Sequence, residues 1–540
     1  MIKNKFDIKL MVYVFLLTSL LCWVVISKPY NSGDPIRSDG IGYHIWTYGI
    51  KNLDFSFCEY EELLGQSISQ VNEEKNRCGV KYPPGVGLMQ LPFSYFWMNN
   101  DALSGFSEGE HWAVLWLGAL LLITGTLIIN ATMKTLNIHS SNIRIISLAL
   151  ITFGTGLFHY STFDASFSHI YSFFGCSMLI YLAVKNSKLH GKWSINNVIF
   201  FAVITYWMYL VRQTNGAITL AVAAYAIYGA MHSERIKLAA TWIISTGLAL
   251  STQLLYNYYV MGTFRVSSYG NESFPGIGTH FFDVLFSYER GLFTYYPIFL
   301  VVLIMGLISR NTLHTLVLFL LTLVFSLVYG SWHSWYLGGG MGHRGFVELT
   351  PFAIIVLAKA LDSMKIKKIV LYIPVFIVCI YTTVAIMISY WNGSFPYAHA
   401  TKEEYITSII TPLISKEPYS IETFKKISID LDRVIFEGDN ITLFIKIKNN
   451  SDENIYKTSP KPPVRMSWRF LAENNKPITN WDPRQDITQS IYNHDLIVEY
   501  INIKRNEIPK KAKYMQVSIV HEGQFWAHDI GMLPLSVDLY

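Results

Sequence analysis

A short acidic turn, Ser38-Asp39-Gly40-Ile41-Gly42-Tyr43, follows the first apolar segment of the chain. An ionisable group at the edge of a membrane is costly to place there and usually has a function. A partly desolvated carboxylate within hydrogen-bond reach of a hydroxyl can remove its proton, so we interpret Asp39 as a candidate general base. Gly40 and Gly42 would let backbone or ligand approach it closely. The alternative is that Asp39 only caps a helix that begins here.

Two further acids and two ring side chains could complete this chemistry. Asp34 is more typical of a turn, although it could itself be the base. Asp164 and His169 share one short turn, where either could bind a sugar hydroxyl or a metal-bridged phosphate, and helix capping is the alternative. Tyr43 lies one turn after Asp39 and would face the same side if a helix begins there.

Four cations lie where an anionic ligand, such as a lipid phosphate, could bind. Lys81 leads through two prolines into an apolar helix, and a lysine that only snorkels to the interface is the alternative. Arg212 follows a predicted span on the side that carries few other cations, which favours a bound anion. Arg290 could simply pair with other charges, but an exposed pair stabilises a protein by less than about 1 kcal/mol. Arg344 is the fourth.

The richest cluster is the glycine-rich stretch 332–345, which ends at Arg344-Gly345. Its glycines free the backbone to line a ligand, and Arg344 offers a planar fork suited to phosphate. We expect Trp335, Tyr336 and His343 to contact a sugar or an acceptor. No zinc-type Cys/His spacing, phosphate loop or nucleophile elbow occurs in the sequence, and the need for a divalent metal stays open.

The composition indicates a membrane protein. Of the 540 residues, 51% are hydrophobic and only 15% are charged, and apolar runs of about 20 residues match the thickness of a bilayer. We expect about eleven transmembrane helices. The first is a retained anchor at 10–27, and others are predicted at 145–159, 195–211, 297–308 and 346–361. Lys/Arg clusters fall on one side of the predicted spans, which places the N-terminus in the cytoplasm and the motif-rich loops outside. No long basic tract indicates nucleic acid as a partner.

The five cysteines divide by position. Cys22, Cys176 and Cys379 lie in apolar runs and are expected to be inert. Cys58 and Cys78 lie in the first hydrophilic loop, 28–82. If that loop is outside the cytoplasm, we expect them to form a disulfide; the alternative is two free thiols.

The composition changes near residue 416. Short runs with alternating apolar and polar residues occur at 427–431, 441–447, 496–503, 514–520 and 533–539, separated by Asn, Asp, Gly and Pro turns. This pattern predicts an all-β sandwich. We therefore expect a transmembrane domain at 1–391, a connector at 392–415 and an external Ig-like domain at 416–540.

Together these segments resemble the GT-C class of membrane glycosyltransferases, which use polyprenyl-phosphate sugars and are related to protein mannosyltransferases and lipid A aminoarabinose transferases. The resemblance covers roughly residues 1–391. The matching segments, in chain order, are Asp39-Gly40-x-x-Tyr43, Lys81-Tyr82-Pro83-Pro84-Gly85, the Asp164–His169 turn, Arg212-Gln213-Thr214-Asn215, Arg290-Gly291-Leu292-Phe293 with Tyr296-Pro297, and Trp335 through Arg344.

The resemblance implies that Asp39 is the base of an inverting transfer from a polyprenyl-phosphate sugar to an acceptor outside the cytoplasm. O-antigen or another surface polysaccharide, a lipid and a protein are all open as acceptors, and membrane lipids are the surroundings. A bacterial inner membrane, with a periplasmic C-terminal domain, is the expected location. Many relatives carry two adjacent acids at the first motif, whereas Gly40 follows Asp39 here. This departure leaves open whether Asp34 or Asp164 assists.

Two other classes of function are alternatives. A transporter or flippase of a lipid-linked sugar would place broken helices and polar residues near the middle of the membrane, within pseudo-symmetric halves. A non-catalytic assembly or binding protein of the cell envelope would not need an acid at the membrane edge together with a loop of Arg, Gly and Trp. The candidate residues instead gather at the predicted external ends of the spans.

Overall fold

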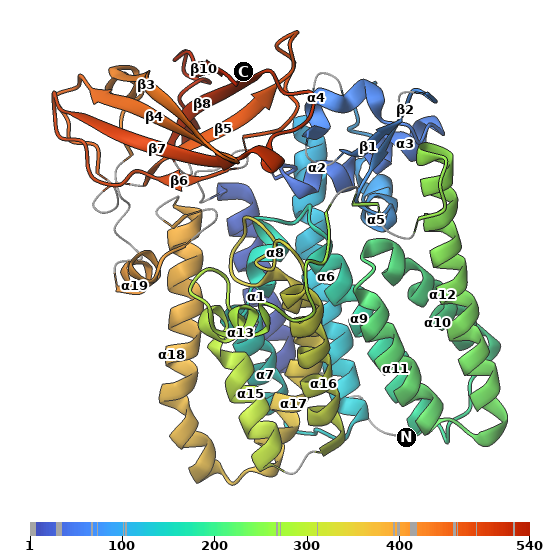
Figure 1. The fold of residues 1–540 in the computed structure, drawn as a ribbon. Coiled ribbons are helices and arrows are strands. Elements are labelled where there is room, and N and C mark those ends of the chain that lie inside the picture. Colours follow the sequence, from blue (N-terminus) through green and yellow to red (C-terminus); the bar gives the residue numbers. More distant parts are fainter. Residues whose placement is uncertain are drawn as a thin grey trace. The chain divides into compact units, whose positions relative to one another are not determined.

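The computed structural model describes residues 7–28, 35–65, 68–72, 74–100, 102, 105–265, 268–269, 272–309, 312–392, 395–396, 400–410, 418–456, 461, 463–481, 483–521 and 524–539. Asp34 lies outside these described residues. The chain divides into two units, residues 1–29 with 33–384 and residues 30–32 with 385–540. The first unit is mostly helical and the second is built on β-sheets (Figure 1).

Five helices in the described part of the chain are long and apolar enough to cross a membrane. They are α1 (Ile8–Ser27), α6 (Glu108–Thr135), α12 (His232–Met261), the segment Leu313–Gly330 of α16 (Thr312–Gly330), and α18 (Ile366–Trp391). Four further apolar helices are only 12 to 17 residues long: α7 (Ser141–Gly154), α10 (Ile195–Val211), α11 (Asn215–Gly229) and α15 (Pro297–Ile308). Since an upright span needs about 20 residues, the predicted total of eleven is not confirmed.

Two predicted spans are divided differently in the structure. The span predicted at 145–159 ends earlier, because α7 stops at Gly154, Thr155 is extended, and a separate helix α8 (Leu157–Thr162) follows. The span predicted at 346–361 begins with the 3-10 helix η3 (Arg344–Leu349) before α17 (Thr350–Ser363). A proline is favourable in the first turn of an α-helix, and Pro351 marks this start. Helix α9 (Ser168–Lys188) lies between α8 and α10 in the chain.

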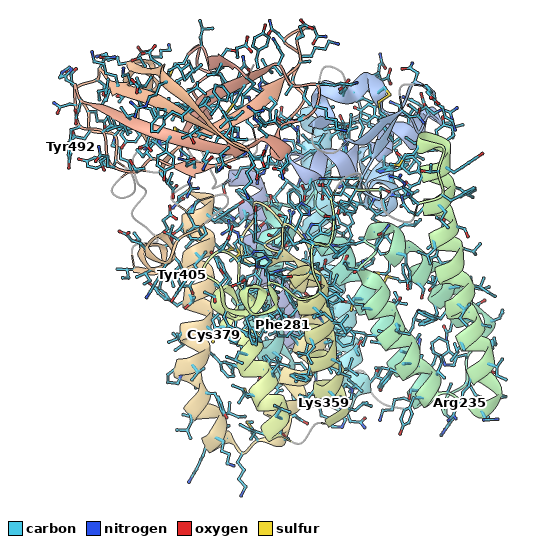
Figure 2. The ribbon with its side chains drawn as sticks, in the orientation of Figure 1. Arg235, Phe281, Lys359, Cys379, Tyr405 and Tyr492 are labelled. Atoms are coloured by element: carbon cyan, nitrogen blue, oxygen red, sulfur yellow. A yellow bond between two sulfur atoms is a disulfide. The ribbon has the colours of Figure 1, made fainter. Side chains whose placement is uncertain are left out.

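The first hydrophilic loop folds into short elements at one end of these helices (Figure 1). Cys58 and Cys78 form a disulfide that ties the 3-10 helix at Cys58–Tyr60 to the hairpin formed by the strands Ile68–Asn72 and Arg77–Val80. Arg235 and Lys359 lie at the opposite end of the helices (Figure 2). The elements are α2 (Asp39–His44), α3 (Trp46–Asn52), η1 (Cys58–Tyr60), α4 (Glu61–Leu64), β1 (Ile68–Asn72), β2 (Arg77–Val80) and α5 (Gly85–Ser94).

A close backbone contact fixes the start of α5. A Cβ atom at Gly85 would lie 2.4 Å from backbone atoms of Leu210 and Val211, at the end of α10. The segment that carries Lys81 and the end of α10 that carries Arg212 are therefore held together. The loop between α12 and α15 contains two further short helices, α13 (Phe281–Phe286) and α14 (Leu292–Tyr295).

The second unit contains two antiparallel sheets that share one apolar core. Strand β4 shows the physical basis, since its residues alternate between buried and partly exposed along most of its length. One sheet has the order β3-β4-β7 and the other β10-β8-β5-β6, with β9 paired to β8. The elements are α19 (Lys402–Ile410), α20 (Ile421–Lys425), β3 (Ile427–Glu437), β4 (Asn440–Asn449), β5 (Val464–Leu471), β6 (Gln485–Asp486), β7 (Leu496–Lys504), η4 (Arg505–Glu507), β8 (Tyr514–His521), β9 (Phe525–Trp526) and β10 (Leu535–Asp538).

Candidate active site

Asp39 begins α2 and forms an ion pair with Arg344, whose Nη2 atom lies 2.6 Å from Asp39 Oδ2. The Tyr82 hydroxyl donates a hydrogen bond to Asp39, and Lys81 adds a second positive charge nearby. Burial alone would raise the pKa of Asp39, but Arg344, Lys81 and Tyr82 together hold this pKa below its ordinary value. The carboxylate keeps 24% of its side-chain surface exposed, so a ligand can reach an ionised base.

The backbone around Asp39 is tightly constrained. Ser38, immediately before it, has φ 48° and ψ −129°, a conformation that is strained for a residue with a side chain. A Cβ atom at Gly40 would lie 2.0 Å from Ser166 Oγ and 2.7 Å from Ser166 Cβ. Glycine is therefore required at position 40 because the turn lies directly against the Ser166 side chain. This contact gives a physical reason for the absence of a second acid next to Asp39.

Gly40→Ala is expected to destabilise the protein by about 1–3 kcal/mol, the usual cost of overpacking, and to displace Asp39. Thermal unfolding in detergent measures the first effect. Adding Ser166→Gly removes both clashing atoms but also the hydrogen bond from Ser166 Oγ to the Pro35 carbonyl oxygen, so it should recover part of the lost midpoint. Gly247→Ala is the matched control, since a Cβ atom there would meet nothing within 4 Å. Equal midpoints for Gly40→Ala and Gly247→Ala would contradict this packing.

Three of the predicted phosphate-binding cations are each paired with a carboxylate in the described part of the chain. Arg344 pairs with Asp39, Lys81 Nζ lies 2.8 Å from Glu272 Oε1, and Arg212 Nη1 lies 3.2 Å from Glu348 Oε1. Within each pair, the carboxylate neutralises the positive side chain, so the charges balance without a ligand. Arg344, Lys81 and Arg212 keep 12%, 14% and 17% of their side-chain surfaces exposed.

Glu348 is a buried acid that is not among the site residues predicted from the sequence. Its Oε1 atom accepts a hydrogen bond from Arg212 and lies 3.0 Å from His169 Nδ1. Its Oε2 atom has no hydrogen-bond partner among the described residues. One signal in the sequence indicated a role for Glu348: it lies inside the span predicted at 346–361, where an ionisable group usually has a function.

Glu348→Ala is expected to lower the free energy of unfolding by about 3–5 kcal/mol, because it leaves the Arg212 charge without its buried counter-ion. Denaturation in detergent measures this loss. Glu234→Ala, which breaks the partly exposed pair with Lys237, is the comparison and should cost less than about 1 kcal/mol. Similar losses of unfolding free energy in the two variants would show that the pair of Glu348 and Arg212 contributes no more than an exposed pair.

The residues predicted to contact sugar or acceptor have different environments. The Tyr43 hydroxyl donates to Ser168 Oγ at 3.2 Å, and its ring lies 4.5 Å from that of Tyr82, next to Asp39. Trp335 and Tyr336 are partly exposed. His343 is fully buried and its Nε2 atom is 3.1 Å from the Trp335 carbonyl oxygen, so in this arrangement the imidazole supports the loop from within.

The Asp164 carboxylate contacts two neighbouring side chains. Its Oδ1 atom is 3.1 Å from Arg37 Nη2, and its Oδ2 atom is 2.9 Å from His159 Nε2. Burial would raise the pKa of Asp164, but the hydrogen bond from His159 and the charge of Arg37 lower it to about 2. Asp164 is thus a fixed anion that fastens the segment before Asp39, rather than a proton carrier near neutral pH.

Arg290 also has partners of its own. Its guanidinium is fully buried, and Nη1 donates to the Glu289 carbonyl oxygen at 2.7 Å and to the Tyr295 hydroxyl at 3.2 Å. No group of three His, Cys, Asp or Glu side chains that could hold a metal ion occurs among the described residues. We therefore assign no metal ligands.

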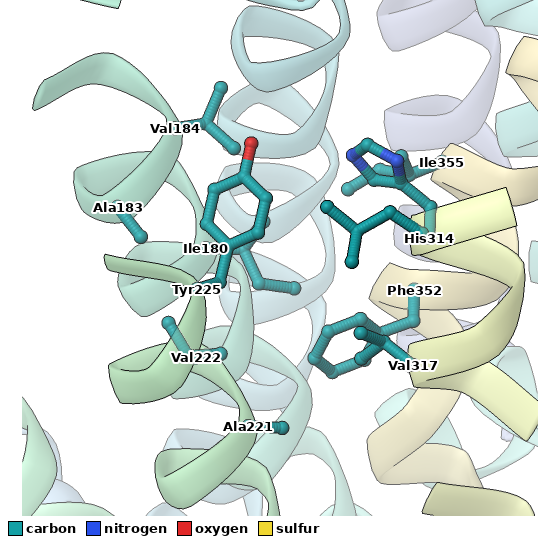
Figure 3. A pocket seen from close by; sticks show the side chains of 11 residues that line it. Ile180, Ala183, Val184, Ala221, Val222, Tyr225, His314, Val317, Phe352 and Ile355 are labelled. Carbon is teal, nitrogen blue, oxygen red and sulfur yellow. The ribbon is translucent and has the colours of Figure 1, made fainter. Parts of the chain in front are cut away.

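A separate apolar pocket lies between α9, α11, α16 and α17. Its volume is about 30 Å³, enough for roughly one water molecule. Figure 3 shows Tyr225 and His314 on opposite sides of it, among aliphatic side chains. Asp39, Lys81 and Arg344 do not line this pocket, so it is distinct from the charged site.

The comparisons with known proteins are sparse. No family model and no curated protein matches the sequence. Among solved structures, the chain is similar to the oligosaccharyltransferase of Archaeoglobus fulgidus in its apo form, with a TM-score of 0.37 and 11% sequence identity. The match covers 78% of this chain and 58% of that one. At this TM-score the likeness carries no argument about function.

Proposed function

We propose that the chain is a membrane glycosyltransferase that moves a sugar from a polyprenyl-phosphate donor to a hydroxyl of an extracytoplasmic acceptor. One observation carries this proposal: a partly exposed, ionised carboxylate, Asp39, lies 2.6 Å from the Arg344 guanidinium. A base beside a phosphate-binding cation is what transfer from a sugar phosphate requires. The second positive charge, from Lys81, strengthens this match.

In the proposed reaction, the acceptor oxygen attacks the anomeric carbon of the donor sugar while its proton passes to Asp39. The bond between that carbon and the phosphate oxygen breaks, and the polyprenyl phosphate leaves with the bonding electron pair. Arg344 and Lys81 neutralise the charge that develops on the phosphate. A single displacement of this kind inverts the anomeric configuration. We propose a surface polysaccharide such as O-antigen as the acceptor, with a lipid or a protein as the alternatives.

We further propose that residues 1–391 form the catalytic membrane domain and residues 416–540 an external sandwich, in a bacterial inner membrane. The distribution of charge supports this orientation, because Arg235 and Lys359 lie at the end of the helices away from the α2–α5 elements (Figure 2). Basic residues favour the cytoplasmic side of a membrane. The Asp39 site would then face the periplasm, with the N-terminus in the cytoplasm.

The test is transfer of radiolabelled sugar in proteoliposomes that contain the purified full chain, polyprenyl-phosphate donors and a cell-envelope extract as the source of acceptor. We expect label to move from the donor into polysaccharide, lipid or protein. Movement of intact labelled donor across the membrane, with no label in any acceptor, would instead identify a flippase. Donor binding without either event would favour a non-catalytic envelope protein.

A further inference from the structure

The second unit carries a cluster of aromatic and cationic side chains on the sheet face turned away from its core. Met466 and Phe470 of β5 enter the core, so Ser467 and Arg469 point to the opposite face. Strand β8 continues this face through Gln516 and Ser518, which pair in register with Arg469 and Ser467. This polar face of β5 and β8 forms the floor of the cluster.

Two connecting segments bring rings over this floor. Arg484 Nη1 donates to Ser467 Oγ at 3.1 Å, and His528 Nδ1 lies 3.1 Å from Ser518 Oγ. Trp481 stacks on His528 with ring centroids 4.7 Å apart, and the rings of Trp481 and Trp526 are 5.9 Å apart. All three rings are partly exposed. Pairing of β9 with β8 places Trp526 opposite Val520, and neither indole belongs to the apolar core.

Two guanidinium groups cap the rings. Arg469 lies 4.7 Å from the Trp481 ring centroid, and Arg484 lies 4.3 Å from that of Trp526. Arg469 Nε donates to Gln516 Oε1 at 2.9 Å, which fixes the plane of the guanidinium. Its two Nη atoms have no hydrogen-bond partner in the described part of the chain. Arg469 therefore presents an oriented, partly exposed fork of donors, the geometry that recognises a carboxylate.

We propose that Arg469, Trp481 and Trp526 form a binding site for an anionic carbohydrate, a glycan chain that carries carboxylate groups. The Arg469 fork takes the carboxylate, and the indoles supply apolar surface against the sugar rings. Arg469 and Arg484 supply the positive charge that an anion requires, and Asp529, the acid paired with His528, is exposed to solvent, which screens its charge. This site is independent of the reaction at Asp39.

The experiment is a titration of the full chain in nanodiscs with tetragalacturonate, with maltotetraose as the neutral comparison. We expect saturable binding of tetragalacturonate and weaker binding of maltotetraose. Arg469→Ala and Trp481→Ala should each weaken tetragalacturonate binding by about tenfold or more, as expected for a central contact. Arg469→Lys keeps the charge but loses the fork, so it should also bind more weakly. Asp39→Asn should bind like the native chain, which separates this test from the transfer reaction.

The matched control is Arg433→Ala, because Arg433 is an exposed arginine stacked 4.3 Å from the Phe444 ring centroid on the other sheet. Native-like binding in this variant supports the proposal. Absence of saturable binding by the native chain would overturn it. Native-like binding of tetragalacturonate by both Arg469→Lys and Arg469→Ala would also overturn the proposal. An equal loss in Arg433→Ala would indicate nonspecific charge attraction. Binding of phosphatidylglycerol vesicles through Arg469, without binding of tetragalacturonate, would assign the surface to a lipid membrane.

Discussion

Asp39→Asn is expected to reduce sugar transfer by about 10²–10⁴-fold, the contribution of a positioned general base. The amide has nearly the same shape as the carboxylate but cannot take a proton from the acceptor. It also removes the negative charge that Arg344 contacts at 2.6 Å, so donor phosphate should still bind. The initial rate of label transfer, measured at saturating donor, checks this expectation.

The control for this substitution is Asp54→Asn. Asp54 is an exposed acid of the same loop, and among the described residues its carboxylate accepts a hydrogen bond only from the Ser56 backbone amide. We expect native rates from this variant. Full activity of Asp39→Asn in a folded, membrane-inserted protein would remove Asp39 from the role of base.

Arg344→Ala is expected to reduce transfer by about 10²–10³-fold, the usual cost of losing one donor to the developing charge. A second effect concerns pH. Arg344 lowers the pKa of Asp39, so its removal raises that pKa. Asp39 then becomes protonated at a higher pH as the solution is acidified, and the acidic limb of the kcat/KM profile should move to higher pH. The pH profile of the residual activity measures this shift.

Arg77→Ala serves as the comparison for Arg344→Ala. Arg77 is a cation of the first loop that stacks 3.9 Å from the Tyr259 ring centroid and donates to the Tyr259 carbonyl oxygen. Its removal should leave the pH profile unchanged. An unshifted acidic limb in Arg344→Ala would mean that Asp39 is not the group whose protonation stops the reaction.

Much of the helical architecture could be predicted because apolar runs are local signals. Helices α10 and α15 have the bounds that their apolar runs predict. The number of spans was harder to predict, because hydropathy does not distinguish a full span from a short helix such as α15 or from the divided segment of η3 and α17. Only the lengths of these helices distinguish them from full spans.

The strands of the second unit could also be predicted only in part. Strands β4 and β7 alternate between the core and the outside, so their pattern is visible in the sequence. Strand β5 was missed because Arg465 and Ser467 are buried as well as the core residues between them. Arg465 is covered through its pairs with Glu404 and Asp486. A strand buried on both faces has no period of two to detect.

The candidate residues could be found by type, but not their partners. The sequence places Asp39 and Arg344 in separate motifs, and no local spacing indicates that they form an ion pair. Glu348 was missed because it was read as part of a hydrophobic span. Its partners Arg212 and His169 come from distant segments that only the fold brings together.

The most direct test of the proposed reaction is the fate of the donor bond in a single preparation of native protein. We expect one polyprenyl phosphate to be released for each sugar transferred, and the product to have the opposite anomeric configuration to the donor. With Asp39→Asn, we expect both products to form about 10²–10⁴-fold more slowly. Recovery of intact donor across the membrane, or a product of retained configuration, would contradict an inverting sugar transfer at Asp39.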